Sequence, residues 1–160
     1  MNLIINKFLN KILRKKKKIF FFDIKTDLST LESIILNCKV IGIDTEFDWR
    51  NTYFPKLSLL QISTKREIFL VDCLDRKDFD IINQILESNE VLKLFHSSRS
   101  DATVLFSNLD IKTKNIFDIQ IAEKLITNSD ITSYAKIVQK YCFINLPKSE
   151  TNSNWLKRPL

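Results

Sequence analysis

Glycine and proline are scarce in this sequence, which has one glycine and three prolines among 160 residues. Tight turns that need a positive φ must therefore be made by Asn, Asp and Ser. No apolar run approaches the roughly 20 residues that a helix needs to cross a bilayer, so we expect no stable membrane span. The three cysteines, Cys38, Cys73 and Cys142, form no Cys-x-x-Cys pair. They argue against a disulfide framework or a structural zinc site and predict free thiols in a cytoplasmic protein.

Acidic residues are missing from the N-terminal segment, residues 1–18, which contains seven basic residues. The rest of the chain has 18 basic and 19 acidic residues. The net charge of +6 therefore comes from this segment and gives no evidence of a basic face on a folded domain. With 44% hydrophobic and 28% charged residues, the whole chain has the composition of a soluble globular protein, and its length suits one domain with its own core.

Apolar residues of the N-terminal segment recur at helical spacing: Leu3, Ile4, Ile5, Phe8, Leu9, Ile12 and Leu13. Three interpretations fit this basic amphipathic extension. It can lie on a membrane surface, contact RNA phosphates as a basic arm, or be a solvated extension without function. A signal peptide is disfavoured because the charges follow the apolar stretch instead of preceding it.

The segment Val40–Phe47 carries the most informative pair of residues. Its short β-branched apolar run predicts a buried strand, which ends in Asp44 and Glu46. Residues two apart in a strand point to the same side, so both carboxylates lie together. Two adjacent anions at a buried strand end need compensation, and a divalent cation is the usual partner of such hard oxygen ligands. The alternative is a strand end that reaches water, where acids cost little.

The periodicity of the chain changes near residue 75. Strands at 19–22, 40–47, 57–63 and 67–73, with a helix opening at Asp27 or Ser29, predict an antiparallel set. A helix at 79–86, a strand at 91–95 and a helix beginning at Asp101 then predict parallel crossover units. Two further helices are expected at 119–126, capped by Asp118, and at 134–141, opened by Ser133. The fold class is therefore α/β, with a mixed sheet flanked by helices.

Several segments follow the acid pair in a characteristic order: Thr52–Ile62, Leu94–Asp101, Asn115–Gln120, Leu146–Glu150 and Trp155–Leu160. In this order and spacing they resemble the exonuclease domain of ribonuclease D, a four-acid (D-E-D-D) 3′→5′ exonuclease. The resemblance covers roughly Phe20 to Leu160 and implies a ribonuclease H-like fold. It implies phosphodiester hydrolysis at RNA 3′ ends with two Mg²⁺ or Mn²⁺ ions.

The resemblance also assigns roles to individual acids. Asp44 matches the acid that bridges both ions, and Glu46 matches the one that helps to hold the ion activating water. Asp101 matches the third acid, which acts on the other ion. His96, the only histidine, is expected to be a hydrogen-bonded supporting or core residue, because the family's catalytic His or Tyr belongs to its last motif. Asp118 is expected to be a cap and not a ligand.

Aromatic and basic residues near these motifs are candidates for nucleic-acid contact. Phe47, Tyr53 and Phe54 can stack on the bases of a single strand, or they can be core residues. Lys148 and Arg158 can contact phosphate, or they can have surface roles.

The sequence departs from the family pattern after its Arg-Pro-Leu segment. The family's last motif, a helix bearing Tyr-x-x-x-Asp, is absent from these 160 residues. Residues 19–160 are therefore expected to form an incomplete exonuclease domain that lacks its C-terminal helix and can be inactive alone. Exposed apolar surface would then favour self-association or a partner chain. The alternative function is a non-catalytic remnant of the fold that binds nucleic acid or a partner, and a weaker one is a membrane-surface protein.

Overall fold

The computed structural model describes residues 17–50, 52–128, 130–146 and 153–159. Within them, six strands form one sheet in the order β1-β4-β3-β2-β5-β6. The strands are β1 (Lys18–Phe22), β2 (Val40–Asp48), β3 (Lys56–Ser63), β4 (Glu67–Asp72), β5 (Leu92–Phe95) and β6 (Ile116–Asp118). The amphipathic extension falls largely outside the described residues. No helix in the described ranges is long and apolar enough to cross a membrane.

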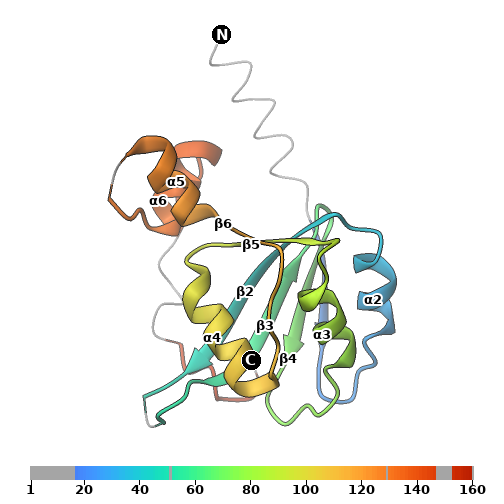
Figure 1. Ribbon diagram of the computed structural model, residues 1–160. Helices are drawn as coiled ribbons and strands as arrows, with labels where there is room; N and C mark the ends of the chain where they lie inside the picture. Colours follow the sequence, from blue (N-terminus) through green and yellow to red (C-terminus); the bar gives the residue numbers. More distant parts are fainter. Residues whose placement is uncertain (1–16, 51, 129, 147–152, 160) are drawn as a thin grey trace.

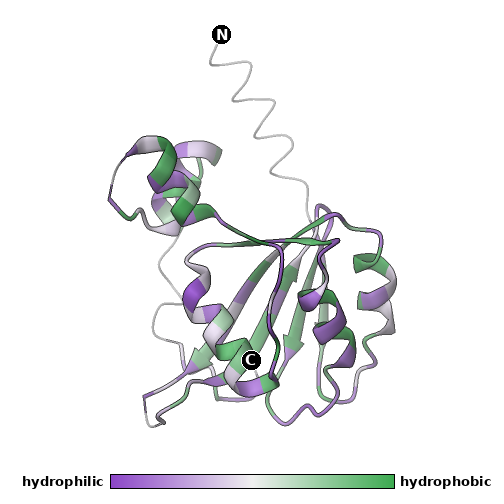
Figure 2. Ribbon diagram, viewed as in Figure 1, coloured by the Kyte–Doolittle hydropathy of each residue, from purple (hydrophilic) through white to green (hydrophobic). Residues whose placement is uncertain are grey.

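The helices are α2 (Ser29–Ile35), α3 (Asp80–Glu87), α4 (Ser98–Leu109), α5 (Ile119–Thr127) and α6 (Tyr134–Cys142). Figure 1 shows α2, α3 and α4 over one face of the sheet, while α5 and α6 form a separate helical pair beyond β5 and β6. Figure 2 shows hydrophobic residues along the strands and a mixture of hydrophobic and polar residues along the helices.

The core lies between the sheet and the three helices. Strand residues that alternate along β2 and β3, including Ile41, Ile43, Leu60 and Ile62, are almost fully buried in it. The residues between them face the opposite side of the sheet, because successive side chains of a strand alternate. That side carries Asp44 and Glu46, so the acids lie on the face that α2, α3 and α4 leave uncovered.

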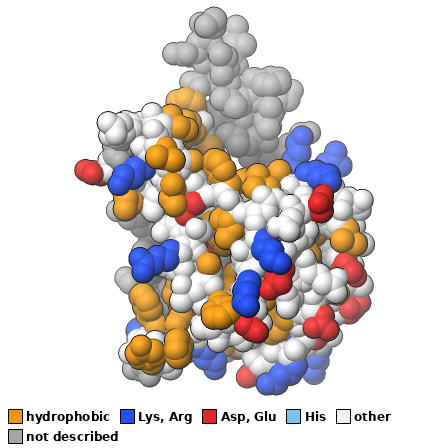
Figure 3. Space-filling model, in the orientation of Figure 1, with side chains coloured by type: hydrophobic (Ala, Val, Ile, Leu, Met, Phe, Trp, Pro, Cys, Tyr) orange, Lys and Arg blue, Asp and Glu red, His pale blue; other side chains and the backbone are white. Residues whose placement is uncertain are grey.

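The uncovered face also carries exposed apolar side chains at its two edges and in its middle. Ile19 and Phe21 of β1, Val40 of β2 and Phe117 of β6 are each between 46% and 63% exposed. On the view of Figure 3, further hydrophobic side chains gather over α5 and α6. Leu125 of α5, for example, is 78% exposed.

The mixed sheet predicted from the sequence is confirmed, with two differences in detail. β2, β3 and β4 are antiparallel neighbours as expected, but β1 pairs parallel to β4 and not antiparallel. A long connection containing α2 and two other strands separates β1 from β4, so no turn links them that would set an antiparallel register. The short strand β6, which pairs parallel to β5, was not predicted because three residues carry little periodicity.

Candidate metal-binding acidic site

Asp44 and Glu46 lie side by side on the uncovered face, as their spacing in β2 predicts. Gln61, directly opposite Asp44 on β3, links them. Its Nε2 donates to Asp44 Oδ2 at 3.1 Å and to Glu46 Oε1 at 3.2 Å. The antiparallel register of β2 and β3 thus holds two carboxylates and one amide together in the second half of β2, which continues to Asp48.

Asp101 reaches the same strand from α4. It lies in the first turn of that helix and is 7% exposed. Its Oδ1 accepts hydrogen bonds from the Thr45 backbone N–H at 3.0 Å and from Thr45 Oγ1 at 2.6 Å. Thr45 stands between Asp44 and Glu46 in the chain, but its side chain points to the covered face. Asp101 is therefore attached to the acid pair through the residue that separates them.

The pKa values of Asp44 and Asp101 are both raised by their surroundings. The pKa of Asp44 is raised to about 6, first because protein atoms displace water around its carboxyl and then because Asp101 is a like charge nearby. His96 partly opposes this rise. Desolvation also raises the pKa of Asp101, against the hydrogen bonds from Thr45. Asp44 keeps exposed surface, so solvent damps these effects and can deliver a cation to the site.

The chemistry of these donors fits a hard divalent cation, which prefers carboxylate oxygens and relieves the repulsion between like charges. The acid pair supplies two such donors on one side of β2. Among the described residues, however, no group of three or more His, Cys, Asp or Glu side chains lies close enough to hold a metal ion. The structure thus brings Asp44 and Glu46 together but turns Asp101 toward Thr45.

A cavity of about 740 Å³ lies beside Asp44 on the uncovered face. Gly42, Gln61, His96 and Tyr134 are among its lining residues. The His96 and Tyr134 rings meet edge to face with their centroids 5.4 Å apart, and His96 Nε2 lies 3.2 Å from the Thr132 carbonyl oxygen. His96 is thus a hydrogen-bonded residue beside the site, as the sequence predicts.

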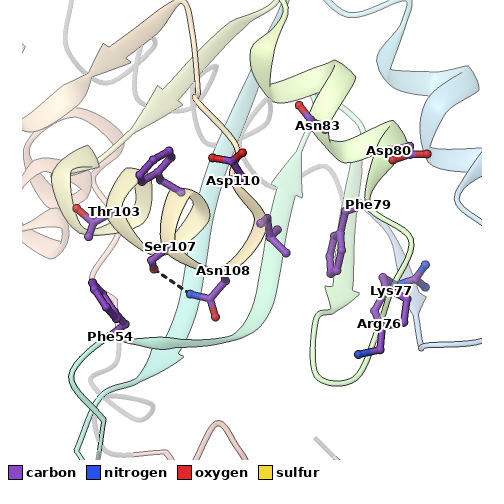
Figure 4. Close-up of a pocket in the computed structure, with 12 residues that line it drawn as sticks. Phe54, Arg76, Lys77, Phe79, Asp80, Asn83, Thr103, Ser107, Asn108 and Asp110 are labelled. Atoms are coloured by element: carbon purple, nitrogen blue, oxygen red, sulfur yellow. Dashed lines mark hydrogen bonds between the residues drawn. The ribbon is translucent and has the colours of Figure 1, made fainter.

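The candidate aromatic residues are placed in two pairs. Phe47 meets Trp49 edge to face at 6.0 Å, close to the acid strand. Tyr53 and Phe54 form a second pair at 4.9 Å and are 92% and 63% exposed, so they are surface residues and not core residues. Phe54 borders a different cavity, of about 860 Å³, between α3 and α4. Figure 4 shows Phe54 beside Ser107 and Asn108 of α4, with Phe79 across the cavity.

Of the two basic residues predicted to contact phosphate, only Arg158 is described by the structure. Lys148 lies outside the described residues. Arg158 is occupied by an ion pair: its Nε and Nη2 each donate at 2.6 Å to one carboxylate oxygen of Asp72. Its Nη2 also donates to the Ser58 carbonyl oxygen at 3.1 Å. Arg158 therefore fastens the C-terminal described segment to the sheet, and a phosphate contact stays only a prediction.

Sequence reasoning missed the two residues that organise the acids, Gln61 and Thr45. Gln61 is a polar residue in an otherwise apolar run, between Leu60 and Ile62, and this interruption was an available signal. Thr45 gave no signal, because its partner Asp101 is 56 residues away in the chain.

Comparison with known proteins gives a consistent result. A family model described as a 3′-5′ exonuclease matches residues 19–160. Ribonuclease D of Desulfotalea psychrophila is 33% identical over 135 residues, covering 84% of this chain and 36% of that protein. The structure of Escherichia coli RNase D, an exoribonuclease involved in structured RNA processing, is 29% identical with a TM-score of 0.81. The superposition covers 88% of this chain and 38% of the E. coli chain.

The catalytic core of RRP6 from Trypanosoma brucei also superposes, with a TM-score of 0.82 at 28% identity, over 91% of this chain and 40% of that one. The chain therefore belongs to the 3′-5′ exonuclease domain family, whose fold is ribonuclease H-like. Curated relatives that it matches in sequence include ribonuclease D proteins, and it spans about a third of their length. Exonucleases of this kind are generally metal-dependent.

Proposed function

We propose that this chain provides a ribonuclease D-type 3′→5′ exonuclease site, which hydrolyses phosphodiester bonds at the 3′ ends of single-stranded RNA. The observation that carries this proposal is the acid pair of β2, linked by Gln61 beside an open cavity, in a chain whose relatives are named ribonuclease D.

Asp44, Glu46 and Asp101 are the residues that would hold Mg²⁺ or Mn²⁺. When bound, a pair of such ions supplies an activated water and stabilises the attacking and leaving oxygens of an in-line displacement. The contribution of the chain is to keep its anionic donors close together. β2 places Asp44 and Glu46 on the same side of the sheet. The side-chain amide of Gln61 offsets part of the repulsion between the two carboxylates by donating a hydrogen bond to each. Asp101 has to reach the same ions from the first turn of α4.

Nucleic-acid contact is proposed on the surface around these acids. Phe47 lies on the acid strand, whereas Tyr53 and Phe54 have large exposed areas and form a pair at the separate cavity between α3 and α4. Exposed rings of this kind stack on bases without regard to sequence. Lys17 and Lys65 line the same cavity as Asp44 and add positive charge to it, which can attract a phosphate backbone. Lys148 and Arg158 are also proposed to contact phosphate.

The experiment is a cleavage assay with 5′-labelled single-stranded RNA and Mn²⁺, comparing the wild type with Asp44→Ala. We expect stepwise shortening from the 3′ end by the wild type and its loss in the variant. Asp48→Asn is the matched control, because Asp48 lies on the same strand but is paired with Arg50, whose side chain is 61% exposed. Equal shortening by all three proteins would point to a contaminating nuclease and contradict the assignment.

A second function, a non-catalytic module that binds nucleic acid or a partner chain, is favoured by two observations. The described residues contain no metal-binding group of three side chains, and the uncovered sheet face carries exposed Ile19, Phe21 and Val40. On this proposal the chain binds RNA without shortening it, and apolar contact drives self-association or partner binding. Sedimentation at several concentrations tests it. A monomer at all concentrations that binds no hydrophobic dye would contradict association through this face.

A further inference from the structure

Asp118 marks the place where two helices begin. It ends β6 directly before α5, and its Oδ1 accepts hydrogen bonds from the Gln120 N–H at 2.9 Å and the Ile121 N–H at 3.3 Å. The same carboxylate accepts from Ser97 N–H at 3.1 Å and from Ser98 N–H at 2.7 Å. Asp118 therefore caps α4 as well as α5, although 20 residues separate it from Ser98.

The turn that enters α4 depends on this contact. Ser97 has a φ of 65°, a left-handed conformation that residues with a side chain rarely adopt. No hydrogen bond from the Ser97 side chain caps the helix. The Ser98 hydroxyl also donates to Asp118 Oδ2, at 2.8 Å. Because β5 and β6 are parallel and Phe95 pairs with Asp118, the carboxylate comes to lie next to the start of α4.

The first turn of α4 is the element that carries Asp101. Ser98 and Asp101 are three residues apart and so lie one above the other on the same side of the helix. Asp101 in turn accepts two hydrogen bonds from Thr45, between the two acids of β2. An unbroken series of contacts thus runs from Asp118 through the start of α4 and Asp101 to the acid strand.

We propose that Asp118 is a positioning residue of the exonuclease site, which sets the direction of Asp101 by fixing the first turn of α4. The inference rests on the proposed function, in which Asp101 helps to hold the metal ions. Asp118 does not touch substrate or metal in this role. It acts through Ser97 and Ser98, whose amides it holds.

The division of hydrogen bonds between the two oxygens of Asp118 suggests a selective variant. Oδ1 serves both α5 amides and Ser97, whereas Oδ2 serves only Ser98, through its N–H and its hydroxyl. Asp118→Asn can keep a carbonyl oxygen toward α5. Its amide group then faces the Ser98 N–H, and two donors cannot bond to each other. This variant should loosen the start of α4 while the start of α5 stays capped.

The matched control is Asp27→Asn. Asp27 Oδ1 accepts a hydrogen bond from the Ser29 N–H at the start of α2, at 3.3 Å. α2 lies beside α3, far from the α4 end of the sheet (Figure 1). The control thus makes the same chemical change at a helix start that is remote from the acids.

The first measurement is amide hydrogen exchange without metal, comparing residues 97–102 with residues 120–124. In Asp118→Asn we expect roughly tenfold faster exchange at the start of α4 and little change in α5. Ser98→Ala, which removes only the hydroxyl contact, should act in the same direction with a smaller effect. Unchanged exchange in α4 in both variants would overturn the inference, and Asp27→Asn should leave α4 unaffected.

The second measurement is RNA shortening with Mn²⁺. Asp118→Asn should lower kcat by roughly tenfold or more with little change in KM, as losses of residues that orient metal ligands do. A kcat within twofold of that of Asp27→Asn would overturn the positioning role. A wild-type chain that shortens no RNA would overturn the proposed function instead. The exchange measurement would then decide alone whether Asp118 holds the turn that carries Asp101.

Discussion

The ion pair between Arg158 and Asp72 should contribute strongly to the stability of this domain. Both guanidinium contacts with the carboxylate are 2.6 Å long, and the side chains of Arg158 and Asp72 are 26% and 9% exposed. Arg158→Met would leave the buried Asp72 carboxylate without its cation and would remove the hydrogen bonds to Ser58. Breaking a fully buried pair costs about 3–5 kcal/mol. Because Arg158 is partly exposed, we expect a loss of about 2–3 kcal/mol.

Urea unfolding measures this loss. With a slope of about 2 kcal/mol per molar urea for a domain of this size, the unfolding midpoint of Arg158→Met should fall by about 1 M or more. Asp72→Asn should be destabilising in the wild type but nearly neutral in Arg158→Met, where it removes an unpaired buried charge. Arg50→Met breaks the pair of Arg50 with Asp48, whose side chains are 61% and 11% exposed, and should lower the midpoint less than Arg158→Met does. Additive effects of the Arg158 and Asp72 variants would refute the reasoning.

Three other perturbations give distinct expected outcomes. Thr45→Val removes the hydroxyl that donates to Asp101 and should destabilise the chain by about 1–2 kcal/mol in urea unfolding. Thr45→Ser keeps the hydroxyl and should retain stability, so equal losses in the two variants would contradict the role of this hydrogen bond. Burial lowers the pKa of Lys93 from 10.5 to about 8. The unfolded chain therefore binds more protons between these values, and stability should rise with pH from 8 to 10.5, by about 3 kcal/mol at most. Urea midpoints across this range should show the rise in the wild type and a smaller one in Lys93→Met; identical profiles would contradict it. Gly42→Ala places a Cβ 2.6 Å from Ser63 Oγ and should destabilise the chain by about 1 kcal/mol in thermal unfolding. The same substitution should cost nothing in a Ser63→Ala background, and a cost that persists there would contradict the clash with Ser63.

The sequence predicts which residues share a face of the sheet, but not which of the two faces the helices cover. Alternation in β2 correctly predicts that Asp44 and Glu46 share a side, because a strand repeats every two residues. It does not say which side the helices cover. That choice depends on which strand residues can form one continuous core, and the burial of Ile41 and Ile43 settles it.

The role of Asp118 could be predicted only in part from the sequence. Its position before a helical pattern predicts a cap for α5, and the structure confirms that cap through the Gln120 and Ile121 amides. The cap on α4 could not be predicted, because it requires β5 and β6 to pair so that Phe95 lies beside Asp118. Register between strands is a tertiary property that neither segment encodes alone.

By itself, the sequence determined the mixed α/β architecture, the family and the pairing of two acids on one strand, since these depend on periodicity and on motifs in order. Only the tertiary structure decided that Gln61 links these acids, that Thr45 holds Asp101, and that Arg158 is bound to Asp72. Each of these contacts joins residues between 15 and 86 positions apart. The physical reason is that a hydrogen bond depends on distance and direction, which the packing of the sheet and helices supplies.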